Sequence, residues 1–566
     1  MGRGIRQGAR PWLLRIWPIL LAGLILIGCA RGTPPFAGIE SFHITLTADN
    51  NTRALTTTAT TVRELLADAG ISLNPSDEVS PPLFTPLTDG LTVTVVRVRE
   101  SVVVIERSVP FSRQIVRSEA LSADDPPMII QGGRAGLEEL TVRIVYRDGL
   151  ESERRTTQVT TLEQAQDEIV MVGIGAAAGN VSFAGMLAYI SSGNGLILRG
   201  SSAFPEQLDI GGGLDGRVFA LSPAGDYLLY TRATTETTTF NSLWLIRADR
   251  DAVPRALGVD NVLWAGWNPS RIELPQIAFT TAEATDLPPG WEANNDLWIG
   301  DVRQNQSLPF QPEQRIEAYP ATYGWWGGSY AWSPTGAAIA YSYADEVGYL
   351  DLQATDLERG RVRLQRFTEY NTRGDWAWIP TISWSADGRY LVFSNHGGNN
   401  ADAPAFNIWA ADISGRWTVP FVENAGMWTH PQWSPAAASL IAYLQALTPQ
   451  DSERSSYALW LMDQDGSNRR QIYPQPGENS RFPRDEQFMA WGPTGRDLAF
   501  IFNNALYLYN LDSGDAYPLV QDDSVNSHPT WAPYGAAIST NLRPTERLPL
   551  PTPDDTREER LPGDNG

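Results

Sequence analysis

The sequence predicts a mainly β protein whose larger part is a β-propeller, and two repeated phrases support that prediction. The first phrase is an aromatic residue or Leu, a Ser or small residue, usually Pro, and usually Gly two residues later. Its copies begin at Leu221, Trp267, Trp332, Trp384, Trp433, Trp491 and Trp531. Start-to-start spacings of 40 to 65 residues match the size of one propeller blade.

Each copy introduces the same order of local structure. A buried strand follows the Pro/Gly turn, as in Ala338–Tyr341, and a second apolar phrase then ends on an acidic turn, as Leu459–Met462 does at Asp463. Strands joined by such turns form an antiparallel meander. One meander cannot bury both of its faces, whereas blades packed radially can. We therefore expect a β-propeller over residues 182–541.

Two incomplete units at the ends of this region predict how the ring closes. Met186–Ile190 and Gly195–Leu198 look like the later strands of a blade that has no opening phrase. His528–Gly535 is an opening phrase without later strands. Pairing the N-terminal and C-terminal strands would complete a seventh blade and leave no free sheet edge in the ring. Seven blades are therefore favoured, and six are the alternative.

The first phrase resembles the repeat of TolB-like propellers, whose usual form is Trp-Ser-Pro-Asp-Gly. The copy at Trp332–Gly336 carries Thr in the fourth position. Asp is present at that position in Asp387, and Asp226 lies just after the Gly of its copy. The resemblance is therefore at the level of the family, and it implies a TolB-like propeller.

The first 29 residues combine a basic start, a short apolar run and a Cys. Four Arg residues precede an apolar run over Ile16–Ile27, and Gly28 stands before Cys29, the one Cys of the chain. The run is short for a membrane span. The segment resembles a bacterial lipoprotein signal peptide with its lipobox. The resemblance implies a signal peptide at 1–28, lipidation of Cys29, a linker at 29–40, and a lipid-anchored protein on the outer side of a bacterial membrane. The alternative is a plain anchor helix in which Cys29 is a chance residue.

Residues 41–98 predict a small α+β domain. His43–Thr47 alternates polar and apolar residues as a half-buried strand does, and a second alternating strand follows the turn at Asp89–Gly90. Between them, Thr61–Glu64 has the spacing of a helix capping box, and Gly70 stands where the helix would end. We expect two strands around one short helix.

The same segment resembles the small ubiquitin-like domain found beside G5 domains in resuscitation-promoting factors and related wall proteins. The residues that carry the resemblance are Thr61–Leu66, Ala69–Ile71, Asp77 and Asp89–Gly90. The cleavage domain that resuscitation-promoting factors carry has no counterpart here, because the propeller region occupies its place.

Residues 99–174 predict an extended β-ribbon. Strand-like runs at Val102–Ile105 and Val142–Tyr146 flank the phrase Gln131–Gly136, whose glycines permit turns and bulges. The segment resembles a G5 domain. One departure is Asp-Asp-Pro-Pro between Leu121 and Met128, where an early Gly is usual in such domains. The resemblance implies adhesion to cell-wall glycan. The alternative is a rigid spacer, because fold analogy alone does not establish a site.

Composition excludes some classes of function. The chain has 43 basic and 65 acidic residues, a formal charge of −22, which disfavours binding to nucleic acid. All basic residues are Arg, so Schiff-base chemistry and a lysine base are excluded. Residues 542–566 are rich in Arg, Pro, Asp and Glu, and we expect a disordered tail there.

Few residues suit catalysis. The chain has four His, of which His430 and His528 occupy matching positions just before two opening phrases. Both could face a common ligand or metal at the propeller axis, but two His without a third ligand underspecify a metal site, and repeat homology is the favoured explanation. Gly327–Ala331 lacks the last Gly of a serine-hydrolase elbow. We therefore expect no catalytic residues, no metal and no cofactor.

Aromatic residues cluster in the loops before two blades. Trp325, Trp326 and Tyr330 lie in a Gly-rich loop before one opening phrase, and Trp376 and Trp378 lie before the next. Exposed aromatic rings stack on sugars or anchor protein partners. Packing between blades is the favoured explanation, and a ligand role for these loops is the alternative.

These observations predict a non-catalytic lipoprotein of the cell envelope. The G5 region would bind wall glycan, and the propeller would bind a protein or glycan partner. One alternative is a hydrolase or lyase of envelope polysaccharide that uses acidic residues of the propeller channel; a hydrolase needs two carboxylates about 5 to 9.5 Å apart. The other alternative is a purely structural spacer.

Overall fold

The computed structural model describes residues 41–532 apart from 50, 119–120, 122–126, 174–180, 237, 250, 304–308, 355, 358, 436–438 and 521. The predicted signal peptide, Cys29, the linker, the end of the propeller region and the tail lie outside these residues. Within the described part, no helix is long and apolar enough to cross a membrane. The described chain divides into two compact units: the residues up to 99 together with 146–149, and residues 100–145 together with those from 150 onward.

The first unit is a four-stranded sheet with one helix, in the order β2-β1-β4-β3. Its elements are β1 (Phe42–Ala48), β2 (Asn51–Thr57), α1 (Val62–Asp68), β3 (Glu78–Ser80) and β4 (Thr92–Val96). The expectation of two strands was wrong. β2 has mostly exposed, polar residues, and β3 has three residues, so neither carries an alternating pattern that reveals a strand.

Residues of the ubiquitin-like motif hold the turns of this unit. The Thr61 hydroxyl accepts a hydrogen bond from the Glu64 backbone N–H at 3.4 Å and caps α1. Gly70 follows the helix at φ 72°, a conformation that favours glycine. The buried carboxylate of Asp77 accepts hydrogen bonds from Arg97 Nη1 at 2.8 Å and from the Val98 backbone N–H at 3.1 Å.

The ribbon consists of two three-stranded sheets, β5-β8-β9 and β6-β10-β7. Its strands are β5 (Val98–Val109), β6 (Arg113–Ser118), β7 (Met128–Gln131), β8 (Gly136–Arg147), β9 (Leu150–Glu163) and β10 (Glu168–Gly173). Close packing explains the glycine phrase. A Cβ at Gly133 would lie 2.2 Å from the Phe111 ring, and one at Gly136 would lie 2.6 Å from the Ala165 backbone nitrogen.

Seven sheets of the described chain form the propeller, each an antiparallel meander. The closing sheet consists of β11 (Ser182–Ser191), β12 (Asn194–Ser201), β13 (Glu206–Gln207) and the C-terminal strand β39 (Asn526–Ala532). The next sheet consists of β14 (Leu214–Leu221), β15 (Tyr227–Ala233), β16 (Asn241–Arg247) and β17 (Arg255–Asp260). The third sheet consists of β18 (Val262–Trp267), β19 (Gln276–Ala284), β21 (Leu297–Asp301) and β22 (Glu313–Ile316), with β20 (Trp291–Ala293) beside β19.

The remaining four sheets continue around the ring. They are β23 (Ser329–Trp332), β24 (Ala338–Tyr343), β25 (Glu346–Asp351), β26 (Arg361–Arg366); β27 (Ile382–Trp384), β28 (Tyr390–His396), β29 (Phe406–Asp412), β30 (Thr418–Val422); β31 (Gln432–Trp433), β32 (Leu440–Ala446), β33 (Tyr457–Asp463), β34 (Arg470–Tyr473); and β35 (Met489–Trp491), β36 (Asp497–Phe502), β37 (Ala505–Asn510), β38 (Asp515–Pro518). Three short 3-10 turns lie between strands in the described loops: Gly324–Trp326, Pro449–Asp451 and Glu486–Phe488.

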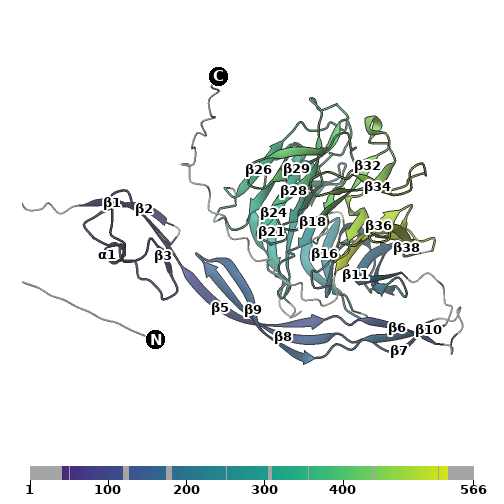
Figure 1. Ribbon diagram of the computed structural model, residues 1–566, viewed down its shortest axis with the longest axis horizontal. Helices are drawn as coiled ribbons and strands as arrows, with labels where there is room; N and C mark the ends of the chain where they lie inside the picture. Colours follow the sequence, from purple (N-terminus) through teal and green to yellow (C-terminus); the bar gives the residue numbers. More distant parts are fainter. Residues whose placement is uncertain are drawn as a thin grey trace, which may run out of the picture. The chain divides into compact units, whose positions relative to one another are not determined.

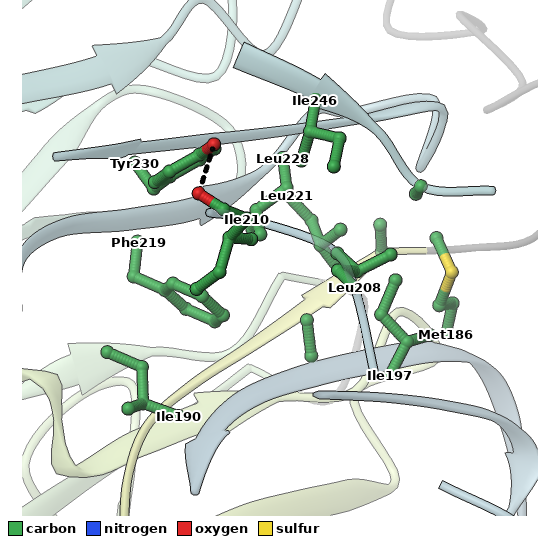
Figure 2. Close-up of a cluster of buried hydrophobic side chains, with 13 residues drawn as sticks. Met186, Ile190, Ile197, Leu208, Ile210, Phe219, Leu221, Leu228, Tyr230 and Ile246 are labelled. Atoms are coloured by element: carbon green, nitrogen blue, oxygen red, sulfur yellow. Dashed lines mark hydrogen bonds between the residues drawn. The ribbon is translucent and has the colours of Figure 1, made fainter. Parts of the chain in front are cut away.

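The ring closes as the incomplete units predicted. β39 pairs antiparallel with β11, so that Trp531 lies opposite Leu187 and Ala532 opposite Met186. The closing sheet packs against β36 and β37 on one side and against β14, β15 and β16 on the other (Figure 1). Figure 2 shows the cluster on the second side, to which the closing sheet contributes Met186 and Ile197 and the next sheet contributes Leu228 and Ile246.

Each pair of neighbouring sheets shares one apolar cluster of buried side chains, and together these clusters go around the whole ring. The prediction of seven blades is confirmed by this packing and by the strand pairing.

The Trp, the Ser and the Gly of the opening phrase each have a structural role. In four copies the Trp ends the first strand of a blade and donates its indole N–H to a backbone carbonyl of the preceding blade, whereas the Trp433 indole has no partner among the described residues and Trp531 donates to Ala184 of its own sheet. The four bonds of this kind are Trp267 to Ala220 (2.9 Å), Trp332 to Gly266 (3.1 Å), Trp384 to Ala331 (2.9 Å) and Trp491 to Gln432 (3.3 Å). In each bond the acceptor directly precedes the aromatic residue or Leu that opens the phrase of the preceding blade.

The Ser and Gly of the phrase make the turn that follows. The Ser385 hydroxyl accepts from the Tyr390 backbone N–H at 2.9 Å, and Ser333 does the same for Ala338 at 3.1 Å. Gly388 and Gly336 both have φ 68°, where a Cβ would be strained. The phrase therefore encodes one contact between blades and one tight turn within a blade.

A buried ion-pair network joins the ribbon to the propeller within the second unit. Arg113 on β6 pairs with Glu168 on β10 and with Glu206 on β13. Glu206 also accepts from Arg199 Nε at 3.3 Å, and the Arg199 guanidinium lies 4.6 Å from the centre of the Phe111 ring. All four charged side chains are at most 7% exposed. Removing one member would leave a buried charge unpaired, which is costly.

The indole bonds between blades can be tested with two matched substitutions. Trp384 and Trp433 are 7% and 8% exposed, but only Trp384 has an acceptor, since the Trp433 indole nitrogen has no partner among the described residues. Trp384→Phe should lower the free energy of unfolding by about 1 kcal/mol more than Trp433→Phe, because only Trp384→Phe removes a hydrogen bond between two blades. Urea unfolding followed by circular dichroism measures both costs. Equal costs would contradict the role of the bond.

Candidate functional site

A cavity of about 340 Å³ lies where several blades of the propeller meet. The structure places Arg217 on β14, Trp264 on β18 and Ser329 on β23 in its wall. Because these are the first strands of three different blades, the cavity lies on the axis of the ring. Its aromatic lining is made of six tryptophans: Trp264, Trp291, Trp326, Trp376, Trp378 and Trp428.

Two tryptophan pairs form parts of the cavity wall. Trp291 and Trp326 have ring centres 5.1 Å apart, and the Trp291 indole N–H donates to the Trp326 carbonyl at 3.2 Å. Trp376 and Trp428 are stacked, with centres 5.8 Å apart and an interplanar angle of 25°. Each pair joins two separate segments of the chain, so these rings brace the loops that carry them.

The structure brings four of the sequence-predicted residues to this one cavity, namely Trp326, Trp376, Trp378 and His430. Three others lie elsewhere. Trp325 packs edge-on against Trp326 at 5.7 Å. Tyr330 is 7% exposed, shares a hydrogen bond of 2.8 Å with the Tyr343 hydroxyl, and lines an adjoining cavity. His528 is treated below.

Loop geometry explains how the predicted aromatics reach the axis. Trp326 ends the 3-10 turn Gly324–Trp326, and Gly327 then has φ 103°, which redirects the chain into β23. A Cβ at Gly328 would lie 2.8 Å from the Ser342 carbonyl oxygen. Trp378 is 2% exposed and donates to the Met427 carbonyl at 3.1 Å, so it holds two loops together at the cavity edge.

The two matching histidines differ in their surroundings. Both have a left-handed backbone, with φ 40° at His430 and 52° at His528, as expected of equivalent positions in two blades. His430 donates from Nε2 to the Arg484 carbonyl at 2.9 Å, whereas His528 Nε2 lies 3.4 Å from a carboxylate oxygen of Asp485. Burial lowers the pKa of His430 to about 4, so its ring is neutral at neutral pH.

A metal site is not formed by these histidines. In the part of the chain that the structure describes, no group of three His, Cys, Asp or Glu side chains could hold a metal ion. The structure therefore gives His430 a place in the cavity wall and His528 a place beside Asp485.

Three charged residues of the cavity were missed by sequence analysis: Arg217, Arg484 and Glu486. The Arg217 guanidinium lies 4.1 Å from the centre of the Trp291 ring and 5.3 Å from that of Phe240. Burial, reinforced by the nearby Asp485 carboxylate, raises the pKa of Glu486 to about 7. Single charges beside apolar strands have no repeat or spacing that would have identified them.

Carboxylates are scarce in this cavity. Glu486 is the one acidic side chain among the described residues that line it, and the adjoining cavity contains the same Glu486 and no second one. Hydrolysis of a glycosidic bond by a pair of carboxylates needs a partner at a defined separation. The lining can instead offer flat rings, two guanidinium groups and one carboxyl group to a bound molecule.

The pKa of Glu486 makes a testable prediction about stability. Its pKa rises from 4.5 in the unfolded chain to about 7 in the folded protein, so ionisation disfavours the folded state. The contribution of protonated Glu486 to the free energy of unfolding is fully present below pH 4.5 and is lost as the pH rises to about 7. Glu486→Gln, which does not titrate, should therefore gain stability relative to the unsubstituted protein across this range and hold the gain above it. Urea midpoints at pH 4.5, 6 and 8 measure the difference. A constant difference would contradict the buried environment.

Comparison with protein families identifies the two N-terminal modules. Residues 44–83 match the G5-linked ubiquitin-like domain, and residues 100–174 match the G5 domain. Both predicted resemblances are confirmed by these matches. Among curated proteins, none matches the chain in sequence.

Solved structures are similar to parts of the chain. A protein assigned as TolB from Agrobacterium tumefaciens is 14% identical, and the match covers 50% of this chain and 88% of that one with a TM-score of 0.30. The tricorn protease is 8% identical over 71% of this chain and 44% of its own, with a TM-score of 0.40. The G5 structure of HP0197 is 19% identical over 14% of this chain and 99% of its own, with a TM-score of 0.12. The blade count and the cavity therefore rest on the strand pairing and packing of this chain.

Proposed function

We propose that this protein is a non-catalytic binding protein of the cell envelope, in which the G5 domain binds wall glycan and the propeller binds a protein or glycan partner. The observation that carries the proposal is a tryptophan-lined cavity on the axis of a propeller that is joined to a G5 domain. Cavities of this size, with aromatic walls and a few polar groups, are typical ligand sites.

The surroundings of the cavity support binding rather than acid–base catalysis. One carboxylate lines it among the described residues, and His430, held neutral by burial, donates to a backbone carbonyl. Five of the six tryptophans are held in place, four by the two ring pairs and Trp378 by its hydrogen bond to the Met427 carbonyl, which keeps the wall preformed. Because the wall is preformed, its side chains lose little conformational entropy when a ligand binds.

The G5 match supports a place at the cell wall, and the signal-like N-terminus supports a lipid anchor at Cys29. The buried network of Arg113, Glu168, Glu206 and Arg199 also favours a fixed connection between ribbon and propeller. In the proposed arrangement, the protein is tethered on the outer side of the membrane, and the ribbon contacts glycan.

Co-sedimentation with purified insoluble peptidoglycan tests the wall-binding part. The full-length protein in detergent should pellet with peptidoglycan, and a variant lacking residues 41–174 should stay in the supernatant, because it lacks the G5 domain. Circular dichroism must show that the shortened variant keeps its β structure. Sedimentation of neither protein would refute wall adhesion and favour a spacer role for the ribbon. Sedimentation of both would place the wall contact on the propeller.

A further inference from the structure

We propose that the tryptophan-lined cavity binds a saccharide that carries a carboxylate, with Arg217 holding the carboxylate and the indole rings stacking on the sugar faces. This inference rests on the proposed function, because it names the ligand class of the same cavity. It separates an acidic saccharide from the neutral glycan and the protein partner that the proposed function leaves equally open.

The first argument is the charge of the cavity. Arg217 and Arg484 both line it, and neither has a carboxylate oxygen within 4.0 Å among the described residues. Glu486 is the one acidic side chain described in the lining. A chain of net charge −22 thus presents a predominantly cationic cavity. Guanidinium groups form paired hydrogen bonds with carboxylates, so an anionic ligand is complementary here.

The second argument is the position of Arg217. Its guanidinium lies over the Trp291 ring at 4.1 Å and near Phe240 at 5.3 Å. Such contacts hold the planar group without using its N–H donors. The donors therefore stay available, while the group loses less freedom when it binds a ligand than a mobile surface Arg would lose.

The third argument is the chemistry of the tryptophan walls. The indole N–H groups of Trp264, Trp326 and Trp376 have no acceptor among the described residues. A ligand that stacks on these rings and also offers hydroxyl oxygens can satisfy them, since indole nitrogen is a donor only. Sugar rings combine apolar C–H faces with hydroxyl groups at their edges. A purely apolar ligand would leave the donors unpaired.

Two probes of equal length separate the carboxylate from the sugar. A hyaluronan tetrasaccharide alternates glucuronic acid with N-acetylglucosamine, and chitotetraose contains N-acetylglucosamine alone. Isothermal titration calorimetry on the full-length protein in detergent should show about tenfold tighter binding of the hyaluronan tetrasaccharide, the size of one charge-assisted hydrogen-bond pair. An acetylated tripeptide with a free C-terminal carboxylate serves as the peptide probe and should bind more weakly than either saccharide.

Matched variants assign the binding to the cavity. Arg217→Met keeps most of the side-chain stem but removes the charge, and it should abolish the preference for hyaluronan. Its control is Arg232→Met, because Arg232 also stacks on a tryptophan, Trp244 at 4.3 Å, but lies outside the cavity. That control should retain the preference.

A second pair of variants tests the aromatic wall. Trp376→Ala removes a ring from the cavity and should weaken the binding of both saccharides. Its control is Trp417→Ala, because Trp417 stacks on Tyr390 at 5.5 Å away from the cavity. The comparison of probes on the unsubstituted protein decides the question even where Arg217→Met fails to fold.

Three results would overturn the inference: equal affinity for the two saccharides, an unchanged preference in Arg217→Met, or tighter binding of the peptide. Failure of the proposed function is distinguishable from these results. Peptidoglycan sedimentation without a preference for hyaluronan refutes the acidic ligand alone. Preference for hyaluronan without sedimentation refutes the wall-binding role of the G5 domain and leaves the cavity assignment in place.

Discussion

The tryptophan hydrogen bonds between blades are the interaction on which the propeller depends. Each one ties the end of a first strand to the backbone of the blade before it, as Trp332 does with Gly266. The same indole ring fills the apolar cluster between the two sheets, so one residue supplies both packing and direction. Apolar contacts alone allow sheets to slide over one another, whereas a directional bond to one carbonyl fixes their register. At the four boundaries between blades that have such a bond, the phrase thus fixes the relative position of the two sheets as well as their packing.

The central cavity is a consequence of this closure. Arg217 and Glu486 are separated by most of the propeller sequence, yet both line the cavity, because the first and last blades meet across the closing sheet. The Leu221 backbone N–H on β14 donates to the Thr530 hydroxyl on β39 at 3.2 Å, which adds a hydrogen bond between the closing sheet and the sheet that follows it. Opening of the β11–β39 pairing would therefore disperse the charged wall of the cavity as well as expose apolar edges.

Sequence patterns revealed the repeated blades and the two N-terminal modules, whose motifs match known domain families, but they failed for the single charged residues of the cavity. The Trp-Ser-Pro phrase predicted the blades because each position has a fixed physical task, seen in Trp384, Ser385 and Gly388. The rim tryptophans were identifiable by their clustering in loops, although sequence alone could not distinguish Trp326, which lines the cavity, from Trp325, which packs behind it. No sequence pattern identified Arg217 as a site residue, because its position in the cavity depends on contact with Trp291, a residue of a different blade.

Charge acts on two length scales in this molecule. The net charge of −22 repels anionic polymers at a distance, but salt screens that repulsion beyond about 8 Å at physiological ionic strength. Inside the cavity, Arg217 and Arg484 act over shorter distances and in partly dry surroundings, where attraction is stronger. An acidic ligand would therefore gain little from long-range steering and would be selected by close contact. Such a site favours discrimination among ligands over rapid capture, and it allows a strongly acidic surface and a cationic cavity to coexist in one chain.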